Sequence, residues 1–241
     1  MCDTPKTVED QQPANRRVFL KSAGVAAIGA ALGPRLAMAE VPKPENVIST
    51  DAGLKRLMEG NERYASGKSG AHNFSAAREA LVSGQNPFAA ILSCADSRIS
   101  PEYAFDSSNG DLFVVRVAGN FVSEEGLASL EFAAEYLGTR LFMVLGHDSC
   151  GAVNGAISAI HDGAVLPGHI PSLVEAIGPA VGLAEEKSGN LLENAIRENV
   201  RMNAATLRAS SPILSKLAAS DELKVVGGVY NLKTGRVELI D

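Results

Sequence analysis

The sequence has no surplus of positive charge, no apolar run of membrane-spanning length and no tryptophan. Its 22 Lys and Arg stand against 28 Asp and Glu, and this net charge of −6 argues against nucleic acid or an anionic membrane as a partner. The apolar stretch over residues 23–32 is too short and too rich in glycine and alanine for a stable membrane span. The length of 241 residues suits one sizeable α/β domain.

Cysteine is also scarce, with three residues in the chain. Cys2 lies in a segment that we expect to be removed, which leaves Cys94 and Cys150 in the mature protein. These two do not form a C-x-x-C motif, so a dithiol redox protein is disfavoured. An oxidising compartment would favour a disulfide between two exposed thiols, whereas thiolates that bind a metal before export would be protected.

The N-terminal segment has the features of a bacterial export signal. Arg16 and Arg17 precede the small-residue apolar stretch, and residues 37–39 (Ala-Met-Ala) have the form of a cleavage site. The paired arginines indicate the twin-arginine route, which carries folded proteins. We therefore predict a signal peptide over residues 1–39, cleavage after Ala39, the twin-arginine export machinery as a partner and a periplasmic mature domain over residues 40–241.

Two short segments carry metal-binding side chains. Cys94 follows the apolar run 88–92, and His147 and Cys150 follow the apolar run 141–145 in an H-x-x-C spacing. Short apolar runs of this kind predict buried parallel strands, and the carboxyl ends of such strands are where open α/β sheets bind ligands. Two thiols and an imidazole suit a tetrahedral Zn²⁺ whose fourth position stays open, as in catalytic zinc sites.

The remaining pattern predicts a single α/β domain with a mostly parallel central sheet of about four strands plus an edge hairpin strand, flanked by helices. The predicted strands cover residues 88–92, 111–117, 140–145, 223–230 and 236–240. The predicted helices cover residues 50–67, 76–82, 101–105, 124–137, 151–160, 171–186 and 191–209, with a short one after Pro212. The first two form an N-terminal helical arm over about residues 50–84.

The motifs C-A-D-S-R at 94–98 and H-D-S-C-G at 147–151 resemble those of the β-class carbonic anhydrases, and the resemblance runs from about Asp51 to the C-terminus. It implies one zinc per chain and reversible hydration of CO₂ to bicarbonate and a proton, by attack of zinc-bound hydroxide. It also implies a homodimer or homotetramer with active sites near subunit interfaces. In the family the arm reaches over a neighbouring subunit; packing of this helix on its own domain is the alternative that the sequence leaves open.

The resemblance assigns roles to further residues. Asp96 would accept a hydrogen bond from the zinc hydroxide, and Arg98 would hold Asp96 in a bidentate pair. In an inactive closed state, Asp96 would leave Arg98 and become the fourth zinc ligand. Four positions match the family's contacts to CO₂ or bicarbonate: Gln85, Phe113, Ala118 and Gly151.

Two alternatives stay open at this point. A zinc hydrolase of the same fold could act on carbon disulfide or carbonyl sulfide, and a non-catalytic zinc-binding protein would keep the same ligands.

No proton shuttle can be named, because His72, His161 and His169 are expected to be solvated surface residues. Allosteric members of the family use a tryptophan where this chain has Ile91, so the missing tryptophan argues against inhibition by bicarbonate at a second site.

Overall fold

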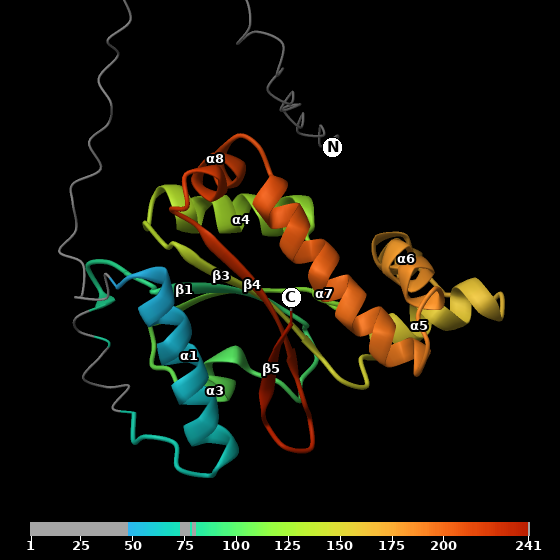
Figure 1. Cartoon of the computed structure of the whole chain (residues 1–241), viewed down its shortest axis with the longest axis horizontal. Helices are drawn as coiled ribbons and strands as arrows, with labels where there is room; N and C mark the ends of the chain where they lie inside the picture. The colour runs from blue at the N-terminus through green and yellow to red at the C-terminus, as the bar shows by residue number, and fades with distance from the viewer. Residues whose placement is uncertain (1–47, 73–77, 79–80, 241) are drawn as a thin grey trace, which may run out of the picture. The chain divides into compact units, whose positions relative to one another are not determined.

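A five-stranded sheet forms the centre of the computed structural model, which describes residues 48–72, 78 and 81–240 (Figure 1). The strand order is β2-β1-β3-β4-β5; the first four strands run parallel, and β5 pairs antiparallel with β4 at the edge. The predicted fold class is therefore confirmed. The strands are β1 (Ala89–Ser93), β2 (Leu112–Arg116), β3 (Leu141–His147), β4 (Lys224–Tyr230) and β5 (Val237–Ile240).

Helices cover both faces of the sheet (Figure 1). On one face, α1 (Thr50–Ala65) and α3 (Pro101–Ala104) pack over an apolar cluster that includes Ile91 and Met143. The other face is covered by α4 (Glu124–Glu135), α7 (Leu191–Ala209) and α8 (Ile213–Ala219). Two further helices, α5 (Gly151–His161) and α6 (Pro171–Glu185), pack against each other and against α7. The predicted signal peptide, and most of the helix predicted at 76–82, lie outside the described residues.

The two strands that lead to the metal-binding segments are the most deeply buried. All residues of β1 and β3 are buried, because helices cover both of their faces and other strands flank them on both sides. Two helices start at serine N-caps: the side chain of Ser49 accepts a hydrogen bond from the N–H of Ala52, and that of Ser123 accepts one from the N–H of Gly126. Buried apolar strands therefore fix where the segments after β1 and β3 begin.

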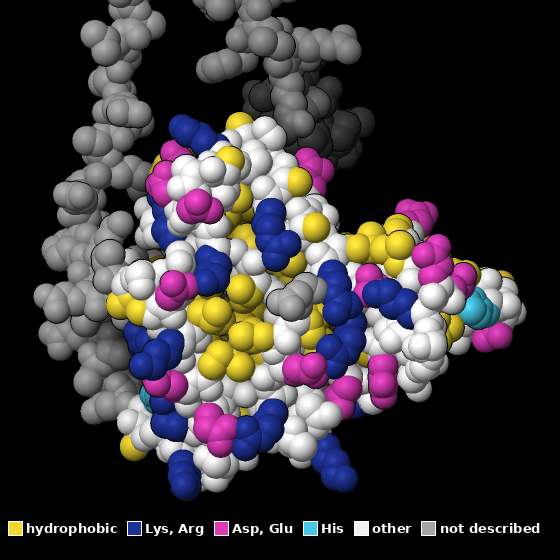
Figure 2. Space-filling model, viewed as in Figure 1, with side chains coloured by type: hydrophobic (Ala, Val, Ile, Leu, Met, Phe, Trp, Pro, Cys, Tyr) yellow, Lys and Arg dark blue, Asp and Glu magenta, His cyan; other side chains and the backbone are white. Residues whose placement is uncertain are grey.

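The outer surface carries both signs of charge. On the face shown in Figure 2, acidic and basic side chains are interspersed around a central apolar area. Ion pairs join Arg236 to Glu62 and Arg197 to Glu238, and exposed pairs of this kind contribute little to stability. Within the described ranges, no helix combines the length and the hydropathy that crossing a membrane requires.

Helix α1 approaches the turn after α3 so closely that only glycine fits at position 60. A Cβ atom on Gly60 would lie 2.0 Å from the backbone oxygen of Phe105. We expect Gly60→Ala to lower the free energy of unfolding by about 1–3 kcal/mol, because the backbone of one element must shift. Gly182→Ala is the control, since its Cβ would have no atom within 4 Å; in the interior of α6, alanine should stabilise the protein by about 0.5–1 kcal/mol. Urea unfolding measures both changes, and equal effects would contradict the packing argument.

Asp106 anchors the segment after α1. Its buried carboxylate accepts hydrogen bonds from Nε of Arg63 at 2.6 Å and from the N–H of Gly70 at 3.0 Å, and it pairs with Nε2 of His72 at 2.9 Å. His72 is therefore a partly buried hydrogen-bond partner of Asp106 with 25% side-chain exposure, and the expectation of a solvated His72 was wrong. The reason is that the segment folds back onto α3, which the sequence pattern did not reveal.

This anchor should weaken in acid. Burial of Asp106 opposes its charged form, but the hydrogen bonds from Arg63, His72 and Gly70 outweigh that effect and hold its pKa below the usual value. The stabilisation is therefore complete above the unfolded pKa of about 4 and is lost as the pH falls through the lower folded pKa. Asp106→Asn should cost stability at pH 6 and progressively less below pH 4. A difference in urea unfolding that stays constant with pH would contradict this assignment.

Candidate metal centre

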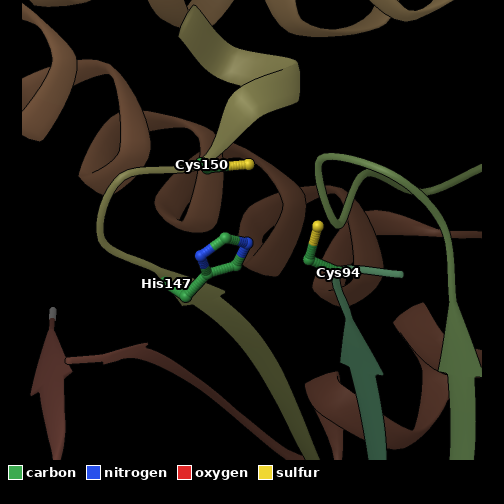
Figure 3. A group of neighbouring side chains, drawn as sticks. All are labelled: Cys94, His147 and Cys150. Atoms are coloured by element: carbon green, nitrogen blue, oxygen red, sulfur yellow. The ribbon is translucent and has the colours of Figure 1, made fainter. Parts of the chain in front are cut away.

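The three predicted metal ligands meet at the carboxyl ends of β1 and β3. Cys94 directly follows β1, His147 is the last residue of β3, and Cys150 is the N-cap of α5. Because β1 and β3 are adjacent and parallel, these positions share one edge of the sheet. One ligand atom from each of the three residues lies within 4.8 Å of the others, and all three side chains are buried (Figure 3). This spacing suits a single tetrahedral ion.

His147 is oriented for metal binding by its backbone neighbour. Its Nδ1 lies 2.8 Å from the carbonyl oxygen of Asp148, which can only accept, so Nδ1 carries the proton. The lone pair on Nε2 then points toward the two sulfurs (Figure 3). Nε2 is buried and has no hydrogen-bond partner in the part of the chain that the structure describes. An unpaired buried nitrogen is costly, and a metal ion would satisfy it.

Cys150 donates a hydrogen bond to Cys94. This bond, opposed by burial and aided by the N–H of Gly119, lowers the pKa of Cys94. The same contact, together with burial, raises the pKa of Cys150 above its usual value, although the N–H groups at the start of α5 act in the opposite direction. A divalent cation beside the pair would take the place of the remaining proton, so the donor set fits Zn²⁺.

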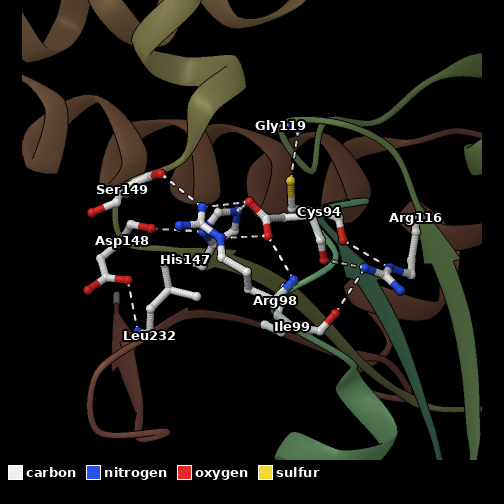
Figure 4. A network of polar contacts seen from close by, with 10 residues as sticks. Cys94, Arg98, Ile99, Arg116, Gly119, His147, Asp148, Ser149 and Leu232 are labelled. Carbon is white, nitrogen blue, oxygen red and sulfur yellow. Dashed lines mark hydrogen bonds and ion pairs between the residues drawn. The ribbon is translucent and has the colours of Figure 1, made fainter.

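The side chain of Arg98 lies close to Cys94 and His147 (Figure 4), and it forms an ion pair with Asp96. Arg98 donates from Nε to Oδ1 of Asp96 at 2.9 Å and from Nη2 to Oδ2 at 2.7 Å, and its backbone N–H also donates to Oδ1. These bonds hold the pKa of Asp96 well below its usual value. Oδ2 of Asp96 lies 3.8 Å from Nε2 of His147, and Asp96 is not part of the three-ligand group. The pair therefore has the geometry in which Arg98 holds Asp96, and not that of the closed state.

Arg116 fixes the segment that carries Cys94 and Asp96, and sequence reasoning gave it no such role. Its guanidinium donates to three backbone oxygens, those of Cys94 at 2.9 Å, Asp96 at 2.7 Å and Ile99 at 2.9 Å (Figure 4). The register of the sheet places Arg116 opposite Ser93, directly before the segment. No sequence motif indicates this role, because it depends on which strands are neighbours.

The four predicted substrate positions are divided between two regions of the chain. Ala118 lies next to Gly119, whose N–H donates to Sγ of Cys94 at 3.3 Å, and Gly151 is the exposed first residue of α5. Phe113 lies near the start of β2 and packs against the apolar cluster under α4. Gln85 is exposed and precedes β1, so it lies beyond the amino-terminal end of that strand, whereas Cys94 follows the carboxyl-terminal end. A single chain therefore brings Ala118 and Gly151 close to the metal-binding residues, but it leaves Gln85 and Phe113 away from them.

Comparison with known proteins agrees with this site. A family model described as carbonic anhydrase matches residues 89–237. Carbonic anhydrase 2 of Mycobacterium tuberculosis is 40% identical over 191 residues, which cover 79% of this chain and 92% of that protein. The carbonic anhydrase of Mycolicibacterium smegmatis is 35% identical over 189 residues, covering 78% and 92%.

Solved structures show the same likeness. The β-carbonic anhydrase CcaA matches with a TM-score of 0.63 at 28% identity, over 79% of this chain and 88% of that one. Coccomyxa β-carbonic anhydrase, solved in complex with acetazolamide, matches with a TM-score of 0.62 at 26% identity, over 78% and 86%. Because the family model, the relatives and the fold agree over most of its length, and because three of its residues could hold one metal ion, this chain belongs to the β-class carbonic anhydrases, the zinc enzymes that interconvert CO₂ and bicarbonate.

Proposed function

We propose that this protein hydrates CO₂ reversibly at the Cys94, His147 and Cys150 centre, with Asp96 and Arg98 as the groups that orient the reacting water. The observation that carries the proposal is the buried Nε2 of His147, which lacks a hydrogen-bond partner among the described residues and faces two thiols beside an ionised carboxylate. When bound there, zinc acts as a Lewis acid that makes water nucleophilic near neutral pH.

The carboxylate of Asp96 supplies a fixed acceptor. Because Arg98 keeps the carboxylate of Asp96 ionised, this group can only accept hydrogen bonds. It therefore aligns a water molecule by accepting a hydrogen bond from that molecule's O–H. The Nη2 of Arg98 also lies 3.3 Å from the carbonyl oxygen of Ser149, which ties the loop after β1 to the loop after β3. Arg98 thereby holds Asp96 away from the ligand atoms, so that a metal held by the three ligands would stay open to water.

Substrate would bind at the start of α5. The backbone N–H of Gly151 belongs to the first turn of the helix, where amide groups lack helical partners and favour anions such as bicarbonate. A Cβ on Gly151 would meet no atom within 4 Å, so a small substrate can approach the backbone there. Ala118 precedes Gly119, whose N–H contacts Sγ of Cys94, and would supply an apolar surface for CO₂.

A second subunit would complete the site. Gln85 and Phe113 match the family's substrate contacts but lie away from the metal centre of their own chain, so we assign them to the site of a neighbouring chain. A homodimer is the smallest assembly that permits this, and a homotetramer would contain two such dimers. The β-carbonic anhydrases of Sordaria macrospora, which share this fold at 21% identity, are described as tetrameric.

Mixed assemblies test the shared site. Gln85→Ala chains and Cys150→Ser chains should each be nearly inactive alone. If Gln85 acts across the interface, refolding them together restores about one quarter of the wild-type sites, because half of random dimers are mixed and each mixed dimer has one intact site. If Gln85 acts within its own chain, no mixed dimer contains an intact site. Failure to recover activity would therefore contradict the assignment.

Stopped-flow hydration of CO₂ by the mature protein, with the zinc content measured in each sample, tests the reaction itself. The rate should rise in proportion to bound zinc, fall to background after chelation and return when zinc is added. Carbonyl sulfide and carbon disulfide are assayed in parallel. Turnover of either compound without CO₂ hydration would assign the chain to the alternative hydrolases, and zinc-loaded protein without any turnover would make it a zinc-binding protein only.

We also propose export to the periplasm by the twin-arginine route, which is supported by Arg16, Arg17 and the Ala-Met-Ala sequence at 37–39. Because that route carries folded proteins, zinc bound in the cytoplasm would protect Cys94 and Cys150 from oxidation. Protein from the periplasm should start after residue 39 and contain one zinc and no disulfide. Replacing both arginines by lysine should retain it in the cytoplasm. Metal-free periplasmic protein with a Cys94–Cys150 disulfide would contradict this sequence of events.

A further inference from the structure

A tight turn after β2 supplies the backbone donor to Cys94. Gly119 and Asn120 have φ values of +87° and +43°, and these two left-handed residues reverse the chain so that the N–H of Gly119 faces Sγ of Cys94 (Figure 4). A Cβ on Gly119 would lie 2.6 Å from Cδ1 of Ile177, so α6 packs directly on the outside of the turn. The turn is therefore both conformationally unusual and tightly enclosed.

Two asparagine side chains of α7 form hydrogen bonds with the backbone of this turn. The Nδ2 of Asn199 donates to the carbonyl oxygen of Gly119 at 2.7 Å, and Oδ1 of Asn203 accepts from the N–H of Val122 at 2.7 Å. Nδ2 of Asn203 also donates to Oδ1 of Asn199 at 3.1 Å, so the two side chains support each other one helical turn apart. Both side chains are buried, with 1% and 8% exposure. The turn is thus held near both of its ends.

The burial of these two amide side chains indicates that they are present for their hydrogen bonds. Along α7 they alternate with Ile196, Val200 and Leu207, which pack into the apolar clusters of the core. A buried amide costs free energy unless its hydrogen bonds are made, and an apolar residue would fill the same volume without that requirement. Packing alone therefore does not account for asparagine at these positions, whereas the backbone groups of the turn do.

We propose that Asn199 is a positioning residue of the metal centre, acting through Gly119 on the Cys94 thiolate, with Asn203 as its support. The N–H of Gly119 fixes the direction of Sγ and withdraws electron density from it, which adjusts how strongly the sulfur binds the metal. The inference rests on the zinc site described above. Wild-type protein that binds no zinc would refute that site itself, whereas the variants below test only the role of Asn199.

The test uses Asn199→Leu, which keeps the volume, and Asn199→Asp, which keeps the shape but removes the donor. Each is expected to weaken zinc binding about 10–100-fold in a chelator competition, the usual effect of losing a group that orients a ligand. Each should also shift the sulfur-to-cobalt charge-transfer absorption of the Co²⁺-substituted protein. This absorption reports the Co–S bond directly, and a change in stability alone does not move it.

Asn194→Leu is the matched control, because Asn194 lies near the start of the same helix and donates to Ser188 rather than to the turn. It should keep wild-type zinc affinity and absorption. Asn203→Leu should shift both readouts in the same direction as the Asn199 variants, but by less. Folded Asn199 variants with wild-type affinity and absorption would overturn the proposal. Failure of all three turn variants to fold would also overturn it, because it would assign these side chains to the stability of α7.

Discussion

Replacing Asp96 by asparagine is expected to lower kcat for CO₂ hydration by about 10²–10⁴-fold while one zinc remains bound. The three ligand side chains are untouched, and Asp96 lies outside their group, so the metal should stay. An amide presents one carbonyl oxygen and two N–H groups and carries no charge, so it cannot align a water O–H as the ionised carboxylate does. Stopped-flow kinetics with metal analysis of the same sample measures both quantities.

Asp51→Asn provides the control for the loss of one carboxylate. Asp51 forms an exposed ion pair with Lys224 at the start of α1, and its side chain is 81% exposed. This variant should keep wild-type turnover and zinc content, since exposed pairs contribute little. Near-normal turnover by zinc-loaded Asp96→Asn would remove Asp96 from the mechanism. Loss of zinc from that variant would instead make Asp96 a contributor to metal binding.

Cys150→Ser is expected to have the largest effect on metal binding. Structural zinc sites bind with about 10–16 kcal/mol; on that scale, one of three ligands accounts for about 3–5 kcal/mol, or about 10²–10⁴-fold in affinity. Serine is a favourable N-cap, and Cys150 occupies the N-cap position of α5, so the helix should still start at Gly151. The variant should therefore fold but lose zinc during purification and hydrate CO₂ at the background rate.

Chelated wild-type protein is the reference for this variant. Stoichiometric zinc should restore wild-type hydration but not that of Cys150→Ser, and competition with a coloured chelator should report the difference in affinity. A Cys150→Ser protein that retains one zinc and wild-type turnover would exclude Cys150 as a ligand and leave the H-x-x-C spacing without a function.

The ligands could be predicted from sequence because each follows a buried apolar strand. Runs of apolar residues before Cys94 and His147 fixed both strands, and parallel strands bring their carboxyl ends to one edge whichever strands are neighbours. The N-cap position of Cys150 followed from the helical pattern after it. The apolar runs and the short H-x-x-C spacing were therefore enough to predict the metal-binding residues and the order of the strands and helices.

The groups that hold the centre in place could not be predicted in the same way. Arg116 acts on the segment after β1 because of the strand register, and Asn199 acts on the turn after β2 because of how α7 is rotated. Both depend on contacts between elements that are distant in sequence. A signal for Asn199 does exist, since it interrupts the apolar side of α7 next to Val200, and a polar residue there indicates a buried partner.

The burial of the ligands also determines how fast metal exchanges. Cys94, His147 and Cys150 expose 4%, 0% and 1% of their surfaces, so a competing chelator has little access to the ligand atoms until the chain opens locally. Release of the ion is then limited by the rate of that opening rather than by the equilibrium affinity alone. In a dilute compartment with little free zinc, the enzyme would keep its ion for as long as these loops remain closed.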